Sequence, residues 1–402
     1  MTRSDQNSEP ADLSGLRIAR IATVPMFFST HLKDQLPAIG EAGAEIDVIC
    51  SDGPQLKDIA WSPRLRSVTI EIPRSISPFA DAKALFALWR QFRKGRYDII
   101  HSTTPKAGLL SALAGWLARV PVRIHTFTGQ PWVTLKGPKA WVAKASDRLI
   151  GRLSTRCFTD SNSQRQFLID QGILKADKVT VLGEGSVAGV DTARFDLANF
   201  PKTEREEARR ALGLDPGDLV FLFLGRICRD KGIFELLQAL SDLRARGYDP
   251  KLVLAGPIES SADDPVPLSA KSLEASGVIH LDFTSEPERY IALSDCLVLP
   301  SYREGFGSVV IEAAAMGRPA IGTDIYGLRD AIVNEETGIL VPPQAVAPLA
   351  AAMRKLIENP QMRADLGQSA RDRARALFTS EALNEAVIAD YAKAVRSRRS
   401  VP

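Results

Sequence analysis

Short apolar runs alternate with longer segments of helical periodicity along most of the chain. Seven runs rich in Val and Ile predict strands in the first half, at residues 17–24, 45–50, 67–72, 98–102, 122–127, 156–161 and 179–183. Helical periodicity between them predicts helices, for example at residues 105–117 and 162–171. Continuous apolar strands separated by helices are typical of a parallel sheet that helices cover on both faces.

The alternation stops at residues 191–218 and then starts again. In this stretch Pro201, Pro216 and a run of charged residues predict a linker followed by a surface helix. Six further apolar runs follow, at residues 219–225, 251–256, 278–283, 296–300, 319–323 and 338–342. Because 402 residues exceed one ordinary hydrophobic core, the doubled pattern predicts two doubly wound α/β domains with a ligand cleft between them.

These patterns give a domain map. We expect a disordered N-terminus at residues 1–15, a Rossmann-like domain at 16–200 and a second at 201–378. Helical periodicity fills residues 360–376 and 380–395. The final segment, 379–402, either closes the second sheet or crosses back onto the first domain.

Composition narrows the class of protein. With 45% hydrophobic and 25% charged residues the chain is globular. Its four cysteines are widely spaced and form no CxxC pair, which favours a reducing compartment and argues against a structural zinc site. No run of about 18 apolar residues occurs, and the polar N-terminus lacks the pattern of a signal peptide. We therefore expect a cytoplasmic protein that spans no membrane.

The first candidate site is the segment 225–232, which follows an apolar strand and precedes a predicted helix at 233–243. Gly225 ends the strand, so backbone N–H groups at the positive end of the helix would be exposed, an arrangement that favours phosphate. Arg226 and Lys231 would add two positive charges at the same place. A solvated basic loop is the alternative reading of this segment alone.

The second candidate site holds two carboxylates eight positions apart, Glu304 and Glu312. The first lies in a glycine loop after a strand, and the second lies on a helix that begins near Phe306, so the two can project along one face. Carboxylates accept hydrogen bonds from sugar hydroxyls, whereas free amides at a helix start bind phosphates. The residues between the carboxylates are Gly305, Phe306, Gly307, Ser308 and Val309.

These residues resemble the retaining glycosyltransferases of family 4. Glu304 and Glu312 reproduce the E-x7-E pattern of that family, and residues 225–232 resemble its diphosphate-binding loop. Residues 327–330 and 336–341 resemble its closing segment. The resemblance covers residues 219–349 closely and the first half more loosely. It implies the GT-B fold, in which two Rossmann-like domains face each other across a cleft.

The resemblance also implies roles for individual residues. Arg226 and Lys231 would bind the donor diphosphate and the charge that develops on the leaving group. Glu312 would bind the ribose hydroxyls, and Glu304 would bind the transferred sugar. Gly225 and residues 305–309 would complete the donor site. Since the chain contains no Asp-x-Asp sequence, we expect no cofactor and no metal.

Many relatives carry a His-Gly pair after the fifth strand of the first domain, where the His contacts the sugar. Here Thr128 stands at that place, and His125 is the nearest substitute. His125 is therefore a candidate catalytic residue, with a hydrogen-bonded histidine at the end of a buried strand as the alternative.

The first half would select the acceptor. Phe27 and Phe28 follow the first strand and could line an apolar channel or belong to the core. Residues 103–110, which include Lys106, and residues 185–191 resemble a subgroup that extends lipid-linked saccharides in capsule, O-antigen or exopolysaccharide synthesis. That resemblance implies a polyprenyl diphosphate-linked saccharide as acceptor and a peripheral place at the inner face of the cell membrane.

A charge pattern supports a membrane partner. The first 200 residues carry 26 Lys and Arg against 19 Asp and Glu, and the remainder carries 25 against 29. Basic residues recur every fourth position at Lys144, Arg148, Arg152 and Arg156, with Trp132 and Trp141 nearby. A basic helix face with Trp residues suits anionic lipid headgroups, and a solvated stripe is the alternative.

We therefore expect a retaining, metal-independent hexosyltransferase that uses a nucleotide-sugar donor, with UDP as the expected nucleotide, and binds no nucleic acid. A nucleotide-sugar 2-epimerase of the same fold and a transferase with a soluble acceptor are the alternatives. A dinucleotide-dependent dehydrogenase is disfavoured because the first strand leads into Val24 and Pro25 rather than a Gly-x-Gly-x-x-Gly turn.

Overall fold

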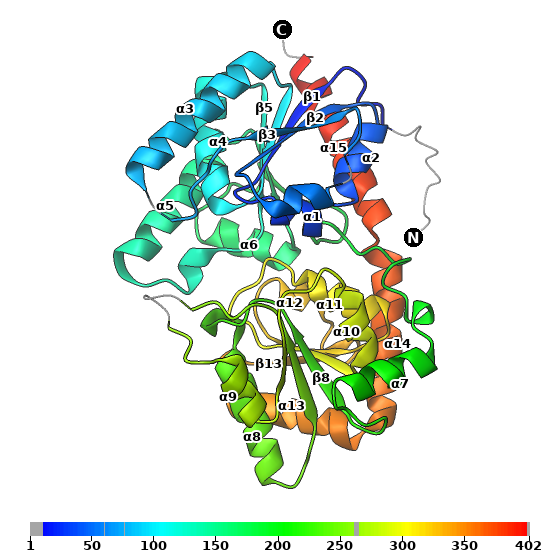
Figure 1. Ribbon diagram of the computed structural model, residues 1–402. Coiled ribbons are helices and arrows are strands. Elements are labelled where there is room, and N and C mark those ends of the chain that lie inside the picture. The colour runs from blue at the N-terminus through cyan, green and yellow to red at the C-terminus, as the bar shows by residue number, and fades with distance from the viewer. Residues whose placement is uncertain (1–10, 60, 76, 261–264, 400–402) are drawn as a thin grey trace. The chain divides into compact units, whose positions relative to one another are not determined.

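The computed structural model describes residues 11–59, 61–75, 77–260 and 265–399, and the chain divides into two compact units (Figure 1). Unit 1 comprises residues 1–188 and 380–402, and unit 2 comprises residues 189–379. The predicted boundary between residues 200 and 201 is therefore too late, because the chain enters unit 2 at Gly189.

The predicted disordered N-terminus falls partly outside the described residues, which begin at position 11. For residues 11–15 the prediction is wrong. Leu13 is fully buried in the core of unit 1, and its backbone N–H donates to the carbonyl of Ala42 at 2.8 Å. The prediction of disorder rested on the polar composition of residues 1–15 and overlooked Leu13.

Unit 1 is built around a parallel sheet. Its strands are β1 (Arg17–Ile21), β2 (Glu45–Cys50), β3 (Leu65–Thr69), β4 (Ile99–Ser102), β5 (Val122–Phe127), β6 (Arg156–Thr159) and β7 (Val179–Val181). They are arranged in the order β3-β2-β1-β4-β5-β6-β7. The chain builds outward from β1 in one direction and from β4 in the other, so a topological switch point lies between β1 and β4.

Side chains of β1 alternate between two cores, as the pleat of a strand requires. Ile18 packs on one face with α1 (Met26–His31), α2 (Gln35–Glu41) and α15 (Ser380–Arg399). Ala19 and Ile21 pack on the other face with α3 (Pro78–Gly95) and α4 (Pro105–Leu117). Figure 1 shows these two groups of helices on opposite sides of the sheet.

The remaining helices of unit 1 cover the far end of its sheet. They are α5 (Gly137–Leu153), which lies beside α4, and α6 (Asn162–Asp170), and they share a core with β5, β6 and β7. Short 3₁₀ turns occupy Pro54–Asp58 and Pro131–Val133.

The last helix, α15, is part of unit 1. Its Val387 and Tyr391 are buried in the same core as α2, and the Tyr391 hydroxyl accepts a hydrogen bond of 2.8 Å from Arg20 on β1. Of the two arrangements left open by the sequence, this is the one in which the last helix crosses back to the first domain.

Unit 2 has a second parallel sheet with the same kind of strand order. Its strands are β8 (Val220–Leu224), β9 (Lys251–Ala255), β10 (Ile279–Leu281), β11 (Cys296–Leu299), β12 (Ala320–Thr323) and β13 (Gly338–Val341). They are arranged in the order β10-β9-β8-β11-β12-β13. The switch point of this sheet therefore lies between β8 and β11, which pair through Phe221 with Cys296 and Leu222 with Leu297.

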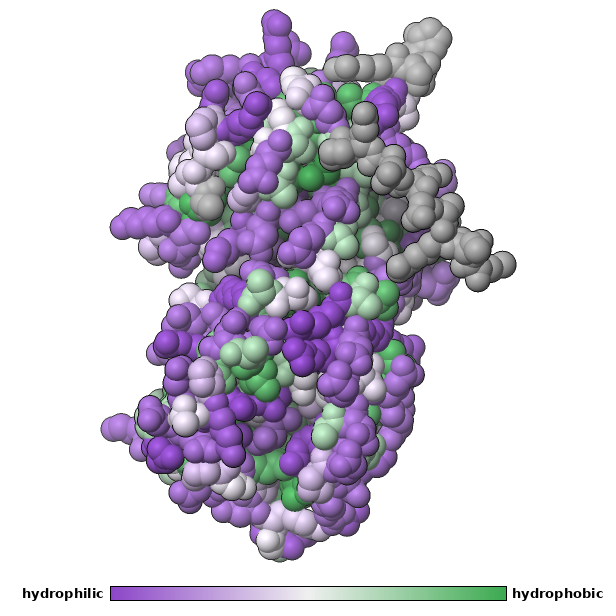
Figure 2. Space-filling view, turned by 90° about the vertical axis from the view of Figure 1, so that its right-hand side faces the viewer, coloured by the Kyte–Doolittle hydropathy of each residue, from purple (hydrophilic) through white to green (hydrophobic). Residues whose placement is uncertain are grey.

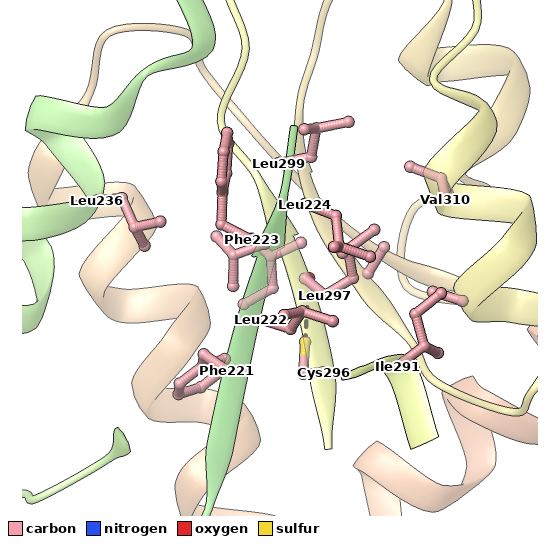
Figure 3. Packing of buried hydrophobic residues seen from close by; sticks show 14 of the residues in the cluster. Phe221, Leu222, Phe223, Leu224, Leu236, Ile291, Cys296, Leu297, Leu299 and Val310 are labelled. Atoms are coloured by element: carbon pink, nitrogen blue, oxygen red, sulfur yellow. Dashed lines mark hydrogen bonds between the residues drawn. The ribbon is translucent and has the colours of Figure 1, made fainter. Parts of the chain in front are cut away.

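Helices enclose this sheet. They are α7 (Lys202–Ala211), α8 (Ile233–Ala245), α9 (Ala270–Ala275), α10 (Pro287–Leu293), α11 (Ser308–Ala315), α12 (Leu328–Ala331), α13 (Val346–Glu358) and α14 (Pro360–Leu377), with 3₁₀ turns at Leu197–Asn199 and Arg229–Lys231. Figure 3 shows Phe221 and Phe223 of β8 on the side of Leu236 in α8, with Ile291 and Val310 on the opposite side. Every residue of β8 is buried, which is why the strand is apolar without interruption.

Each apolar run predicted as a strand overlaps one, and the ends differ by a few residues; β3, for example, spans Leu65–Thr69 and so begins before its predicted run at 67–72. Two doubly wound parallel α/β units are thus confirmed. Among the described residues, no helix combines the length and the apolar character needed to cross a bilayer.

Candidate functional site

The two segments singled out in the second half meet at the switch point of unit 2. Residues 225–232 follow the carboxyl end of β8, and residues 300–307 follow that of β11. These strands are neighbours, and ligands of open α/β sheets bind at the carboxyl ends of strands flanking such a point. The sheet order therefore brings together two segments far apart in the sequence.

Glycine allows the two loops to touch. Gly232 has a φ of 70°, and a Cβ at this position would overlap the carbonyl oxygen of Pro300. Gly225 has a φ of 145°, and its carbonyl oxygen would overlap a Cβ placed on Gly256 in the loop after β9. Any side chain at positions 232 or 256 would push the loops apart.

The predicted lysine and the first predicted glutamate are in direct contact. The Lys231 ammonium pairs with Oε1 of Glu304, and the hydroxyl of Ser301 donates to the same oxygen at 2.8 Å. Only 16% of the Lys231 side chain and 14% of the Glu304 side chain are exposed. Both charges are therefore held in place by partners that the loops supply.

Arg226 lies in the same loop but has another partner. Its Nη1 lies 2.6 Å from Oε2 of Glu259, and each of these two side chains is more than one third exposed. An isolated β-bridge between Ile227 and Ile258 places Glu259 beside the arginine. Sequence reasoning missed Glu259, since only the pairing of the loops after β8 and β9 reveals it.

Asp230 links the two cations electrostatically. Burial alone would raise the pKa of this carboxyl, but nearby Arg303, Lys231 and Arg226 outweigh it and hold the pKa below its usual range. Arg303 Nη2 lies 2.6 Å from Asp230 Oδ2, and the backbone N–H of Tyr302 donates to the Asp230 carbonyl at 2.8 Å. Asp230 and Arg303 were also missed, although Asp230 lies inside the first predicted segment and Arg303 directly precedes Glu304.

The helix that follows the second loop begins inside the candidate site. Helix α11 begins at Ser308 after Gly307, whose φ of 88° is left-handed, and no side chain caps its N-terminus. Residues Ser308 and Val309 form its first turn, so this end of the helix carries the positive end of a peptide dipole. The Phe306 side chain is buried against Phe378, and only its backbone can take part in binding.

The two glutamates are not placed by helical periodicity as predicted. Because α11 begins at Ser308, Glu304 lies in the loop and its position follows from Lys231 and Ser301 rather than from the helix. Glu312 is half-buried on α11. Burial raises the pKa of Glu312 to about 7, with Arg194 lowering it and Glu288 raising it by smaller amounts. Arg194 and Glu288 are themselves an ion pair, with Nη2 of the arginine 2.7 Å from Oε2 of the glutamate.

The arrangement suits an anionic ligand with hydroxyl groups. It combines the basic residues Arg226 and Lys231, uncapped helix amides, and the carboxylates Glu304 and Glu312 in the loops and helix around one switch point. In the part of the chain that the structure describes, no three His, Cys, Asp or Glu side chains are grouped to hold a metal ion.

His125 lies in the interior of unit 1. It is 2% exposed, its Nδ1 lies 3.0 Å from the Ser102 hydroxyl, and its ring packs against Gly108 and Phe127. Burial lowers its pKa to about 3, so the ring is neutral at physiological pH. This environment favours the alternative of a hydrogen-bonded histidine at the end of a buried strand.

The other predicted acceptor residues near β1 and β4 have structural partners. Phe28 is fully buried, and Phe27 meets it edge to face while remaining partly exposed. Lys106 pairs with Asp81 at 2.7 Å. A feature that the sequence did not indicate lies at the switch point of unit 1, where the hydroxyls of Thr23 and Thr104 are 2.7 Å apart.

The predicted basic stripe is interrupted. Arg156 is not on the helix but on β6, where it pairs with Asp390 at 2.5 Å. Lys144 donates to Gln171 at 2.6 Å and lies over the Trp132 ring, whereas Arg148 and Arg152 are exposed.

The two tryptophans differ. Trp132 is 9% exposed and donates to Asp147 at 2.7 Å, so it belongs to the core and cannot contact a membrane. Trp141 is 70% exposed. The basic residues at every fourth position therefore share a helix face only as far as residue 153, where α5 ends.

Comparisons with known proteins match each half separately. Residues 16–185 match the family described as glycosyl transferase 4-like domain, and residues 204–373 match glycosyl transferases group 1. A capsular polysaccharide biosynthesis glycosyltransferase, CapM, of Staphylococcus aureus is 31% identical over 90% of this chain and 93% of its own length. A glycogen synthase of Mycobacterium tuberculosis is 31% identical over 75% of this chain and 65% of its own length.

Solved structures share the architecture. A sucrose-phosphate synthase from Thermosynechococcus elongatus superposes with a TM-score of 0.74 at 23% identity, covering 92% of this chain and 96% of the other. Anabaena HepE in complex with UDP and glucose superposes with a TM-score of 0.75 at 18% identity, covering 93% and 99%. The GT-B architecture expected from the sequence is confirmed.

Proposed function

The chain belongs to the glycosyltransferases with a 4-like and a group 1 domain, and from this premise we propose a specific reaction for it. It transfers a hexose or N-acetylhexosamine from a UDP-linked donor to a polyprenyl diphosphate-linked saccharide in surface polysaccharide synthesis, with retention at the anomeric carbon and without a metal. The observation that carries the donor half of this proposal is the contact between Lys231 and Glu304 at the switch point of unit 2.

The cations act on the leaving group. Cleavage of the bond between the sugar and the diphosphate leaves negative charge on the nucleotide, and fixed positive charge beside it lowers the barrier. Lys231 and Arg226 supply that charge, and the amides of Ser308 and Val309 add the dipole of α11. Their present carboxylate partners, Glu304 and Glu259, orient both cations before the donor arrives.

The glutamates recognise hydroxyl groups. Glu304, held by Ser301 and Lys231, accepts hydrogen bonds from the transferred sugar. Glu312 accepts them from the ribose, a role that requires its ionised form. Attack by the acceptor on the face that the diphosphate leaves accounts for retention without an enzyme nucleophile.

The acceptor half is supported by one relative in particular. CapM, which resembles this chain over nearly its whole length, is named for capsular polysaccharide biosynthesis. Relatives named D-inositol 3-phosphate glycosyltransferase and glycogen synthase favour a soluble acceptor as the second candidate.

A donor screen followed by product analysis tests the proposal. Nucleotide sugars are screened for an increase in melting temperature, since a ligand of the native state alone stabilises it. The donor so found is incubated with a short-chain polyprenyl diphosphate-linked sugar, with and without excess chelator, and the product's anomeric configuration is determined by NMR. Stabilisation by UDP-sugars and a retained configuration in chelator support the proposal.

Several outcomes contradict it. A product with inverted anomeric configuration would contradict the retaining mechanism. Loss of activity in excess chelator would contradict metal independence. Transfer to a soluble sugar but not to the lipid-linked one would establish the second candidate. Conversion of the donor alone into an isomer would identify a 2-epimerase instead.

A further inference from the structure

Helices α3, α4 and α5 expose large apolar side chains. Phe79 and Phe86 on α3 are 93% and 60% exposed, and Trp141 on α5 is 70% exposed. Trp116 at the end of α4 is 54% exposed. Exposed aromatic residues on three neighbouring helices, which lie side by side on one side of the sheet, are unusual for a surface that meets only water (Figure 1). We call the exposed residues of these helices the α3–α5 face.

The exposed charges of the α3–α5 face are all positive. They belong to Lys83, Arg90, Arg93, Lys94, Lys139, Arg148 and Arg152. The three helices contain two acids, Asp81 and Asp147. Asp81 is paired with Lys106 and Asp147 is buried, so neither offsets this charge at the surface.

Aromatic and basic residues share one stripe on α3. Phe79, Lys83, Phe86 and Arg90 follow each other at spacings of four, three and four, which places them on one side of the helix. The sheet-facing side is made of Ala84, Leu88 and Phe92, which are buried in the core. The exposed stripe is thus not needed for folding.

The face adjoins the edge of unit 1 where a ligand would bind. In a parallel α/β layer each crossover helix begins at the carboxyl edge of the sheet, so Phe79 and Trp141, near the starts of α3 and α5, lie toward that edge. The Lys106–Asp81 pair joins the starts of α4 and α3 there. The hydroxyls of Thr23 and Thr104 lie at the same edge.

Two other described parts of the surface differ from the α3–α5 face. Figure 2 shows a different side of the chain, where polar residues dominate and hydrophobic ones are scattered. Helix α7 in unit 2 exposes charges of both signs, among them Lys202, Glu204 and Glu207, and no large apolar side chain.

We propose that the α3–α5 face docks this chain on an anionic lipid membrane. Aromatic rings enter the headgroup region, and lysine and arginine contact lipid phosphates. A second copy of the chain is a poor occupant, because two uniformly basic faces repel each other. The inference deepens the proposed function and rests on it, because a lipid-linked acceptor gives the chain a reason to bind a membrane. The docking surface now comprises three helices instead of the predicted basic stripe of α5 alone.

Vesicle flotation tests the proposal with the full chain. Wild type is mixed at low salt with vesicles of phosphatidylcholine alone or of phosphatidylcholine and phosphatidylglycerol in equal parts. We expect binding to the anionic vesicles only, weakened by high salt. F79S/F86S and K83E/R90E should each bind roughly tenfold or more weakly, because apolar insertion and charge attraction both contribute.

Matched controls exclude general effects of substitution. F283S removes a phenylalanine that is 51% exposed in unit 2, and K202E reverses a lysine whose side chain is 82% exposed on α7. Both should bind the vesicles as wild type does, and unchanged melting temperatures show that the variants fold. Failure of wild type to float with anionic vesicles, or flotation of F79S/F86S equal to wild type, overturns the proposal. The proposal is also overturned if the wild-type chain self-associates and F79S/F86S abolishes this self-association without changing flotation.

A separate assay distinguishes this proposal from the proposed function. Transfer to a short-chain acceptor in detergent needs no membrane, so F79S/F86S should retain wild-type activity there. Flotation without transfer by wild type contradicts the proposed function alone. Transfer without flotation contradicts the docking surface alone.

Discussion

The switch points of the two units share one topology and differ in chemistry. In both sheets the first strand of the unit lies beside the fourth, and loops follow both strands at the carboxyl edge. In unit 2 these loops carry Lys231 and Glu304 in contact, with Arg226 nearby. In unit 1 they carry the neutral pair Thr23 and Thr104, whose hydroxyls share a hydrogen bond.

This difference shows how one fold can serve two partners in one reaction. The topology creates a place for a ligand at each edge, and side chains decide what binds there. Ionic groups at the edge of unit 2 suit a diphosphate. Neutral hydroxyls at the edge of unit 1 suit a sugar, and the basic, aromatic α3–α5 face suits an anionic lipid surface.

Removal of the lysine is the strongest test of this contrast. For Lys231→Ala we expect kcat to fall on the order of a hundredfold to a thousandfold, as for loss of one group that stabilises transition-state charge. Stability should fall less, by about 1 kcal/mol, because Glu304 keeps its bond from Ser301. Steady-state kinetics and thermal melting measure the two effects.

A double variant separates the roles of charge and packing. K231A/E304Q removes the unpaired carboxylate as well, so its melting temperature should recover while its activity should not. Recovery of activity together with stability would mean that the Lys231–Glu304 pair is structural. The ionic groups at the switch point of unit 2 would then have no catalytic role that distinguishes them from the threonines of unit 1.

The glycine contact between the loops gives the next largest effect. Gly232→Ala should lower the stability of unit 2 by about 2–4 kcal/mol and weaken donor binding, because the new Cβ overlaps the Pro300 carbonyl and the loops must separate. Gly213→Ala is the matched control, since its φ of 72° is nearly that of Gly232, at 70°, but no atom lies within 4 Å of its Cβ position. Equal melting temperatures for the two variants would contradict a role for loop contact.

The sequence predicted the strands well because strands buried on both faces are continuous apolar runs, as in β8. It singled out Lys231 and Glu304 because each lies in the loop that follows such a strand, and the sheet order brings those two loops together. Glu259 and the pair of Arg194 and Glu288 could not be predicted, since their proximity to the site depends on contacts between loops and helices distant in sequence.

Errors had a common physical cause. Periodicity was extended across helix ends that the sequence does not mark. Helix α5 ends at Leu153, so Arg156 is not part of the basic stripe on that helix. Helix α11 begins at Ser308, so Glu304 does not lie on the same helix face as Glu312. Burial was equally hidden, since Trp132 and Trp141 look alike in sequence although one is buried and the other is exposed.

The raised pKa of Glu312 predicts a pH dependence specific to unit 2. Its folded pKa is about 7 against an ordinary value of 4.5, so the native state holds this proton more tightly than the unfolded state does. Stability therefore falls as pH rises between these values and stays lower above about pH 7. Glu312→Gln lacks this loss and should be more stable than wild type at about pH 8, by about 2 kcal/mol.

Melting temperatures of both proteins across this pH range provide the measurement. The two should converge at about pH 4.5, where Glu312 is largely protonated in wild type, and diverge above it. A variant that is no more stable than wild type at alkaline pH would contradict the burial of this charge. Unit 1 offers no equivalent carboxylate on the helix after β4, since α4 contains no acid.

The smallest effect is expected at the threonine pair of unit 1. Thr104 Oγ1 accepts a hydrogen bond of 3.0 Å from the Thr23 backbone N–H and shares a second with the Thr23 hydroxyl, so Thr104→Val leaves both groups without this partner at unchanged side-chain volume. Stability should fall by about 1 kcal/mol, and the KM for the acceptor should rise while the KM for the donor stays constant. Thr104→Ser, which keeps the hydroxyl, should restore the acceptor KM. A rise in donor KM instead would break the comparison, because it would show that the neutral edge of unit 1 also serves the nucleotide sugar.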